Sequence, residues 1–179
     1  MIMEYIKTGI GVWIIEPLIL KDERGYFMES YKKAEFEQKI GKVDFIQDNE
    51  SKSSYGVFRG FHYQEGEAAQ AKLIRAIQGK VWDIAIDIRK NSVTFGKYVT
   101  VELSEENKRQ FFIPRGFAHG FLVLSETAVF SYKVDNIYSP AHERTINCMD
   151  SDLAIQWPID QSLIRLSEKD RVGKRLKEI

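Results

Sequence analysis

Three histidines, His62, His119 and His142, are the only imidazoles in this chain of 179 residues. The unperturbed pKa of a histidine is near 6.5, so such a side chain can take or give a proton at neutral pH. A lone histidine is otherwise an ordinary core or turn residue. His62, in RGFHYQ, is the better candidate for chemistry because two cations, Arg59 and Lys72, lie near it in the sequence.

A proton acceptor is useful together with a proton donor, and Tyr132 is a candidate for that role. It shares a strand face with Phe130 and Val134, so its ring is expected to point inward. A buried tyrosine hydroxyl needs a partner, which leaves Tyr132 as either a plain core phenol or a proton donor. Asp170 is likewise either the last residue of a helix-capping sequence, Ser167-Glu168-Lys169-Asp170, or a functional carboxylate.

The elements that must position these residues are mostly short strands. Two-residue alternation predicts half-buried strands over 81–88, 98–103 and 128–134. Glycines separate the strands, and many short strands with close turns predict a mainly β sandwich or barrel, with a jelly roll as the leading candidate. In 81–88 the alternation divides the residues into two faces, Trp82, Ile84, Ile86 and Ile88 against Asp83, Ala85 and Asp87.

Helix is sparse in the predicted fold. Residues 32–40 predict one short helix that ends at Gly41, and a second helix begins after Ser167, with Gly173 limiting its length. Strict alternation would put Arg59 and His62 on opposite strand faces. Gly60 therefore predicts a β-bulge that re-aims one of these two side chains.

Composition excludes several classes of protein. The 26 basic and 26 acidic residues cancel, so no net field favours nucleic acid or an anionic membrane. The apolar N-terminal stretch is interrupted by charges, glycines and Pro17, so it predicts neither a signal peptide nor a membrane span. One cysteine, Cys148, permits no internal disulfide and predicts a packing role in a cytoplasmic protein. The length predicts a single domain over residues 1–179.

Pro114, Gly116 and His119 form a P-x-G-x-x-H turn that resembles the second motif of the cupin jelly rolls. The first cupin motif carries H-x-H and a downstream glutamate, which bind a metal together with the second-motif histidine. Here the pair is His62-Tyr63-Gln64, so tyrosine replaces a ligand. With Glu67, the two histidines could still hold iron, but the incomplete set predicts no metal and no other cofactor.

Seven parts of the sequence, taken together, resemble the dTDP-4-dehydrorhamnose 3,5-epimerase family over nearly the whole chain. The matching segments are DERGYFMES (22–30), FIQDNESKS (45–53), GVFRGFHYQ (56–64), AKLIRAIQGKVWDIAIDIRKNSVTFGKY (71–98), LSEENKRQFFIPRGFAHGFLVLSE (103–126), FSYKVDNIYSP (130–140) and LAIQWP with LSEKD (153–170). The resemblance implies a cupin-type jelly roll and epimerisation of a dTDP-4-keto-6-deoxyhexose. It also implies a homodimer whose N-terminal strands are shared across the interface.

The resemblance implies roles for individual residues. His62 is expected to be the general base, Asp170 its orienting partner and Tyr132 the general acid. Lys72 is expected near the ketone oxygen, where a cation stabilises the enolate that forms when an α-proton leaves. The remaining residues expected to bind the nucleotide sugar are Arg24, Glu29, Gln47, Asp48, Asn49, Arg59, His119, Tyr138, Glu143 and Lys169, with Tyr138 stacking on the thymine.

Two stretches depart from the family pattern. EGEAA (65–69) replaces a proline-containing turn, and ERTINCMD (143–150) lacks the usual tryptophan before an acidic pair. Four other functions stay open beside the double epimerase. They are an epimerase of C3 or C5 alone, a keto-isomerase that moves the carbonyl, a non-catalytic sugar-nucleotide-binding cupin, and a metal-dependent cupin oxygenase.

Overall fold

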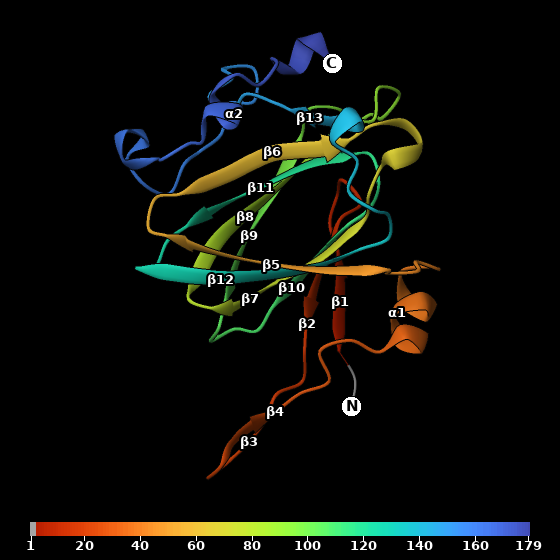
Figure 1. Cartoon of the computed structure of the whole chain (residues 1–179). Helices are drawn as coiled ribbons and strands as arrows, with labels where there is room; N and C mark the ends of the chain where they lie inside the picture. Colours follow the sequence, from red (N-terminus) through yellow and green to blue (C-terminus); the bar gives the residue numbers. More distant parts are fainter. Residues whose placement is uncertain (1–2) are drawn as a thin grey trace.

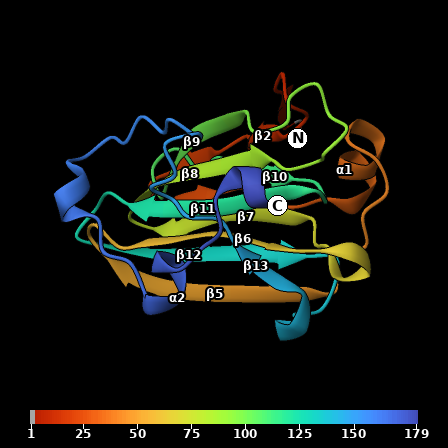
Figure 2. The same ribbon diagram turned by 90° about the horizontal axis from the view of Figure 1, so that it is seen from above.

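The three strands predicted from alternation form as β8 (Lys80–Asp87), β9 (Tyr98–Ser104) and β12 (Thr127–Val134) in a computed structural model that describes residues 3–179. They belong to two antiparallel sheets that face each other, as the predicted mainly β jelly roll requires (Figures 1 and 2). The six-stranded sheet runs in the order β1 (Glu4–Lys7), β2 (Trp13–Glu16), β10 (Gln110–Ile113), β7 (Lys72–Gln78), β12 and β5 (Gln47–Ser54). The five-stranded sheet runs β13 (Glu143–Thr145), β6 (Phe58–Gln64), β11 (Phe117–Val123), β8 and β9.

Helices are short and lie outside the two sheets. The predicted helix near 32–40 is α1 (Lys33–Lys39), and Gly41 after it has a φ of +126°, which a side chain would oppose. The second helix, α2 (Glu168–Arg171), begins at Ser167 as predicted but lasts one turn. Four 3₁₀ turns complete the described chain, η1 (Gly66–Ala68), η2 (Pro140–His142), η3 (Gln161–Leu163) and η4 (Leu176–Glu178).

Three apolar clusters hold these layers together. The central cluster fills the space between the sheets, with Phe111, Phe121 and Phe130 almost fully buried. A second cluster lies on the outer face of the five-stranded sheet, beneath the C-terminal segment that runs over it (Figure 2). The third packs α1 against the outer face of the six-stranded sheet around Phe36 and Phe112. Both sheets are therefore covered on two sides for part of their area.

Because both faces of the sheet are covered, the burial of β8 differs from the prediction. Ile84 and Ile86 share the outer cluster with Trp82 and Ile88, as predicted. The opposite face is not solvent-exposed, because Asp83 and Asp87 are both fully buried. The expectation of a half-buried strand is therefore wrong for β8, since the C-terminal segment covers one face and the second sheet covers the other.

A β-bulge in β6 confirms the prediction at Gly60. His62 pairs with His119 and Arg59 pairs with Phe121. The chain advances three residues on β6 between these two pairs and two residues on β11, so β6 carries one extra residue. Gly60 has a φ of +139°, and a Cβ there would lie 2.5 Å from the Cα of Gly120. The two strands can approach this closely only because glycine occupies both positions.

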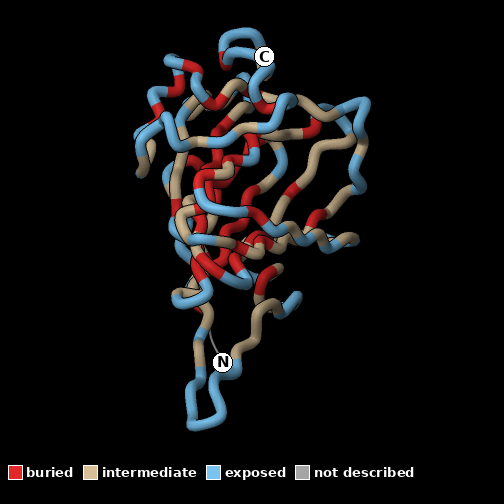
Figure 3. Tube along the Cα trace, turned by 60° about the vertical axis from the view of Figure 1, so that its left-hand side comes forward, coloured by how far each residue is buried: buried red, intermediate tan, exposed pale blue. Residues whose placement is uncertain are grey.

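Outside the two sheets, β3 (Leu20–Asp22) and β4 (Gly25–Phe27) form a hairpin that projects from the body of the molecule (Figures 1 and 3). Its apolar residues are exposed, with Tyr26 at 55% and Phe27 at 60%. None of the helices between residues 3 and 179 has the length or the apolarity that a membrane crossing demands.

Gly60→Ala is expected to lower the free energy of unfolding by about 2–4 kcal/mol, because it adds both a disfavoured φ and a backbone clash. Gly9→Ala is the matched control, since an added Cβ at this position meets no atom within 4 Å. Urea unfolding measures both variants. A Gly60→Ala midpoint equal to that of Gly9→Ala would show that the bulge tolerates a side chain.

Candidate active site

A cavity of about 410 Å³ opens between the two sheets and brings together half of the candidate residues. Six strands or helices contribute to it: β5, β6, β7, β11, β12 and α2. The predicted residues that line it are Arg59, His62, Lys72, His119, Tyr132, Lys169 and Asp170. Residues that are distant in the sequence, such as His62 and Asp170, therefore meet in one place.

His62 and Asp170 form a close pair. The Nε2 atom of His62 lies 2.5 Å from Oδ1 of Asp170, and the Asp170 side chain is 4% exposed. Burial raises the pKa of Asp170, but the hydrogen bond and charge of His62, together with the Ser167 cap, outweigh it and leave that pKa below its usual value. Asp170 is therefore ionised at neutral pH and fixes the orientation of the His62 ring.

A second histidine–carboxylate pair lies deeper in the cavity. His119 Nε2 lies 2.9 and 3.1 Å from the two carboxylate oxygens of Asp83, and Asp83 is fully buried. Burial lowers the pKa of His119, aided by the charges of Lys72 and His62 and opposed by Asp83. Sequence reasoning missed Asp83, because on an alternating strand its face was indistinguishable from a solvent face.

Lys72 is a half-buried cation at the start of β7. Burial lowers its pKa to about 8, while the carboxylates of Asp83 and Glu143 act in the opposite direction. At pH 7 the ammonium is still the main form. The cavity therefore holds a poorly solvated positive charge that can respond to negative charge developing on a ligand.

Tyr132 faces the cavity from β12, on the sheet opposite His62. Burial raises the pKa of its phenol, and Arg59 opposes this shift. The hydroxyl therefore keeps its proton at neutral pH. Beside it, Phe130 and Phe121 stack with ring centroids 3.9 Å apart and form an apolar wall.

The rim of the cavity carries a cluster around Glu143. Lys169 forms an ion pair with Glu143, and the Tyr138 hydroxyl donates a hydrogen bond of 2.7 Å to Glu143 Oε2. Burial raises the pKa of Glu143, but Lys169, Tyr138 and His62 together hold it below its usual value. Tyr138 is 54% exposed, so its ring is open to solvent at the edge of the cavity.

The bulge at Gly60 explains how Arg59 and His62 reach the same cavity from one strand. The Arg59 guanidinium is anchored by a hydrogen bond of 2.9 Å from Nε to Ser53 Oγ. The other nitrogens of Arg59 have no protein partner within residues 3–179, which leaves them free for an anionic ligand.

The three consecutive candidates on β5 divide between two faces. Asn49 pairs with Tyr132 and shares its inward face, where Gln47 donates to it at 2.7 Å. Asp48 lies on the outer face and pairs with Lys133 at 2.9 Å. Gln47 and Asn49 are therefore placed on the cavity side of the sheet, and Asp48 is not.

Besides Asp48, two further candidates lie apart from the cavity in the single chain. Arg24 is at the tip of the projecting hairpin, where it pairs with Asp22 and its side chain is 84% exposed. Glu29 follows the hairpin, and its Oε2 atom is buried without a hydrogen-bond partner in the described part of the chain. Neither residue lines the cavity of its own chain.

Within residues 3–179, the site contains neither a group of metal ligands nor a reactive thiol. Within residues 3–179 no three His, Cys, Asp or Glu side chains are grouped closely enough to hold a metal ion. Glu67 is exposed on η1 and is absent from the cavity that contains His62 and His119. Cys148 is buried in the outer cluster, where burial and the charge of Asp170 raise its thiol pKa to about 12.

This geometry is suited to moving protons at carbon. A histidine oriented by a carboxylate lies on one sheet and a protonated phenol on the other, with a half-buried ammonium in the same cavity. Groups on opposite sides of a bound ring can remove a proton from one face and return one to the other. The ammonium can stabilise an oxyanion formed between these two steps.

Comparison with known proteins gives matches along nearly the whole chain. Residues 8–178 match the family model described as dTDP-4-dehydrorhamnose 3,5-epimerase. An epimerase of that name from Shigella flexneri is 54% identical, with 97% of this chain and 96% of the relative aligned. Solved structures of this family include a Legionella pneumophila enzyme with dTDP-4-keto-L-rhamnose bound, with 49% identity, a TM-score of 0.94, and 99% and 94% of the two chains covered.

A more distant match inverts a single carbon. The structure of a 3′-monoepimerase from Streptomyces bikiniensis is 33% identical with a TM-score of 0.90, and the alignment covers 96% of this chain and 87% of that one. The fold is therefore shared by enzymes of different regiospecificity. The cupin-type jelly roll expected from the sequence is confirmed by these structures.

Asp83→Asn is expected to lower the pKa of Lys72 below about 8, because the Asp83 carboxylate is one of two charges that raise it. NMR titration of ¹³C-labelled lysine side chains measures this pKa, and the Lys72→Arg variant identifies the Lys72 signal. Asp152→Asn, an exposed acidic residue outside the cavity, is the matched control. A Lys72 titration that is the same in both variants would remove Asp83 from the electrostatics of the site.

Proposed function

Because the chain belongs to the dTDP-4-dehydrorhamnose 3,5-epimerase family of isomerases, we propose that it converts dTDP-4-dehydro-6-deoxy-D-glucose to dTDP-4-dehydro-L-rhamnose. The reaction inverts C3 and C5, which both flank the C4 ketone. One observation carries the proposal: the His62–Asp170 pair and the Tyr132 hydroxyl face one cavity from opposite sheets. Inversion needs an acceptor and a donor on opposite faces of the ring.

The steps follow from the residues. His62 removes the proton from C3 or C5, and the C–H electron pair forms the enolate, whose charge rests on the C4 oxygen. Asp170 stabilises the imidazolium produced. Lys72 stabilises the enolate oxygen, and Tyr132 gives its phenolic proton to the other face of the same carbon. Exchange with water then returns the proton to Tyr132 and removes the one on His62.

We propose that the nucleotide part of the substrate lies toward the rim. Arg59 and Lys169 supply cations for the pyrophosphate, and a guanidinium can donate two parallel hydrogen bonds to a phosphate. Tyr138 offers an exposed ring for stacking with the base. Gln47, Asn49, His119 and Glu143 supply neutral or acidic groups for hydroxyl and base contacts.

We also propose a homodimer in which the hairpin of one chain packs on its partner. An isolated two-stranded hairpin is marginal in water, and this one exposes Leu20, Tyr26 and Phe27. The β2 strand pairs within its own chain, so the uncovered apolar surface is the part that follows it. In such a dimer Arg24 and Glu29 would contact the partner's site.

A cytoplasmic location is proposed from the chemistry of the chain. Its one cysteine is buried, and a protein without disulfides suits a reducing compartment. The activated sugar substrate carries a nucleoside diphosphate, which the proposed site holds through cations.

Replacing His62 and replacing Tyr132 are expected to have different effects on hydrogen exchange and on epimerisation. His62→Asn abolishes exchange of the C3 and C5 hydrogens with D2O, because the base is gone. Tyr132→Phe keeps the base, so deuterium still enters, but from the His62 face and with the original configuration, and net epimerisation falls by about 10²–10⁴-fold. NMR of the sugar measures deuterium and configuration at both carbons.

His142→Asn and Tyr55→Phe are the matched controls, since both residues lie outside the cavity. Full epimerisation by Tyr132→Phe would remove Tyr132 from the mechanism. Deuterium at one carbon only in the wild-type product would show a single-carbon epimerase.

Lys72 is expected to set an alkaline limit to turnover. Its charged form is present below its pKa of about 8 and is lost as the pH rises, so the free-enzyme kcat/KM falls above about pH 8. Lys72→Arg keeps its charge past pH 12 and should lose that limit. Lys72→Met should lower kcat by about 10²–10³-fold with little change in KM, because the enolate charge exists only after proton removal. An alkaline limit that persists in Lys72→Arg would assign it to another group.

The dimer proposal is tested by assembly and by complementation. Light scattering should give twice the 20.8 kDa of one chain. Replacing Tyr26 and Phe27 by Ser should weaken the dimer, whereas Val93→Ser, at an apolar residue 97% exposed on another loop, should not. Co-expressed His62→Asn and Arg24→Ala chains should regain activity, because a mixed dimer has one complete site if Arg24 acts on its partner. Activity no greater than the sum of the two variants would contradict this arrangement.

A further inference from the structure

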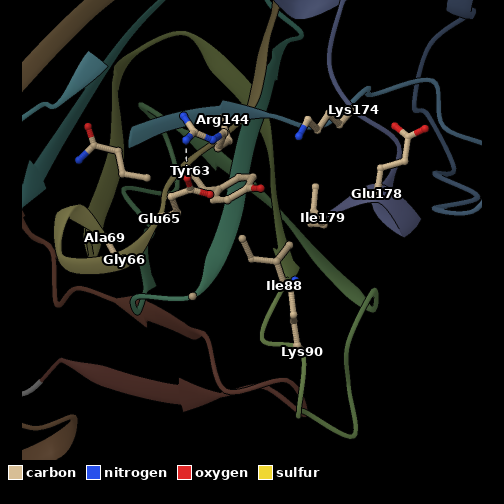
Figure 4. Close-up of a pocket in the computed structure, with 12 residues that line it drawn as sticks. Tyr63, Glu65, Gly66, Ala69, Ile88, Lys90, Arg144, Lys174, Glu178 and Ile179 are labelled. Atoms are coloured by element: carbon tan, nitrogen blue, oxygen red, sulfur yellow. Dashed lines mark hydrogen bonds and ion pairs between the residues drawn. The ribbon is translucent and has the colours of Figure 1, made fainter. Parts of the chain in front are cut away.

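A second hollow of about 400 Å³ lies outside the barrel, on the face of the five-stranded sheet that is turned away from the catalytic cavity (Figure 4). It lies near the C-terminal end of the chain, at the other end of the molecule from the projecting hairpin (Figure 1). The residues that decide its character are Tyr63, Ile88, Lys90, Arg144, Lys174 and Ile179. None of them lines the catalytic cavity.

The register of β6 and β13 explains why the two cavities are back to back. Tyr63 pairs with Arg144, and the neighbouring pair is His62 with Thr145. Because successive side chains on a strand point to opposite faces, Tyr63 and Arg144 face the outer hollow while His62 faces the inner cavity. The outer hollow and the proposed base, His62, therefore lie on opposite faces of the same strand, β6.

The floor of the hollow is apolar and partly aromatic. The ring of Tyr63 lies across it, with Ile88 and Ile179 beside the ring (Figure 4). Burial raises the pKa of Tyr63, aided by Glu65, so its hydroxyl stays protonated. That hydroxyl has no hydrogen-bond partner within residues 3–179, and it can donate to a ligand.

The walls carry more free positive than free negative charge. Lys90 and Lys174 form no ion pair with any residue between 3 and 179, and Lys174 extends over the hollow (Figure 4). Arg144 pairs with Glu65 beside them. Glu178 accepts a hydrogen bond from the Arg175 backbone, and its carboxylate turns away from Tyr63 (Figure 4).

Two segments that are distant in the sequence supply walls of the hollow. Residues 65–69 supply one wall and Arg144, in the unusual segment 143–150, supplies another. The ion pair between Arg144 and Glu65 joins the two segments.

We propose that this hollow binds a small ligand that carries a planar ring and an anionic phosphate or carboxylate group. The ring stacks on Tyr63 between Ile88 and Ile179, and the anion lies against Lys174 and Lys90. The volume is in the range of sites that hold small molecules, which are mostly apolar with a few polar groups. The site is independent of the proposed epimerase activity.

Phenyl phosphate is the probe, since it combines a ring with a dianion. Calorimetry should detect its binding to the protein, and NMR shift mapping should place it at Tyr63 and Lys174 rather than at His62 and Tyr132. Inorganic phosphate and phenol should each bind more weakly than phenyl phosphate. Comparison with benzoate then identifies whether phosphate or carboxylate is the preferred anion.

Lys174→Gln should weaken phenyl phosphate binding about two- to fivefold, as expected for one ion pair in solvent. Tyr63→Leu keeps an apolar floor but removes the ring, and should weaken binding about two- to tenfold. Lys177→Gln is the matched control, because Lys177 is exposed on η4 and does not line the hollow. Shift changes centred on His62 and Tyr132, equal effects of Lys174→Gln and Lys177→Gln, or full affinity in Tyr63→Leu would each overturn the proposal.

Discussion

The hydrogen bond between His62 and Asp170 is the contact on which the rest of this architecture depends. It joins a barrel strand to a helix of one turn that lies 108 residues further along the chain. The carboxylate is almost fully buried, so it must be paired with a hydrogen-bond donor to be tolerated there. The C-terminal segment therefore has to cross the five-stranded sheet along a path that places Asp170 against His62.

Several local features hold that segment in place. Arg165 bridges to Val57 and Lys174 bridges to Ile146, on either side of α2. Gly173 passes so close to the chain that an added Cβ would lie 2.6 Å from the backbone nitrogen of Asn147. Ser167 accepts a hydrogen bond from the Asp170 backbone. Gly173, which was expected to weaken the helix, is thus required for close packing. This packing ends the helix early.

Much of the fold was predictable because its signals are local. Alternation located β8, β9 and β12, and a glycine between Arg59 and His62 predicted the bulge. The role of Asp83 was not predictable in this way, because burial on both faces of β8 depends on a C-terminal segment more than sixty residues away. The position of Arg24 was not predictable either, since the hairpin contacts no part of the cavity in its own chain. The family resemblance named Arg24 as a candidate, whereas neither the resemblance nor the periodicity named Asp83.

The two histidine–carboxylate pairs are anchored to parts of the chain that differ in how readily they open. Asp83 belongs to β8, which is hydrogen-bonded to β9 on one side and β11 on the other. Asp170 belongs to one helical turn held by isolated bridges. Local opening of such a segment costs less free energy than unfolding of a central strand. The molecule can therefore lose the orientation of His62 while the barrel, and the pairing of His119, remain intact.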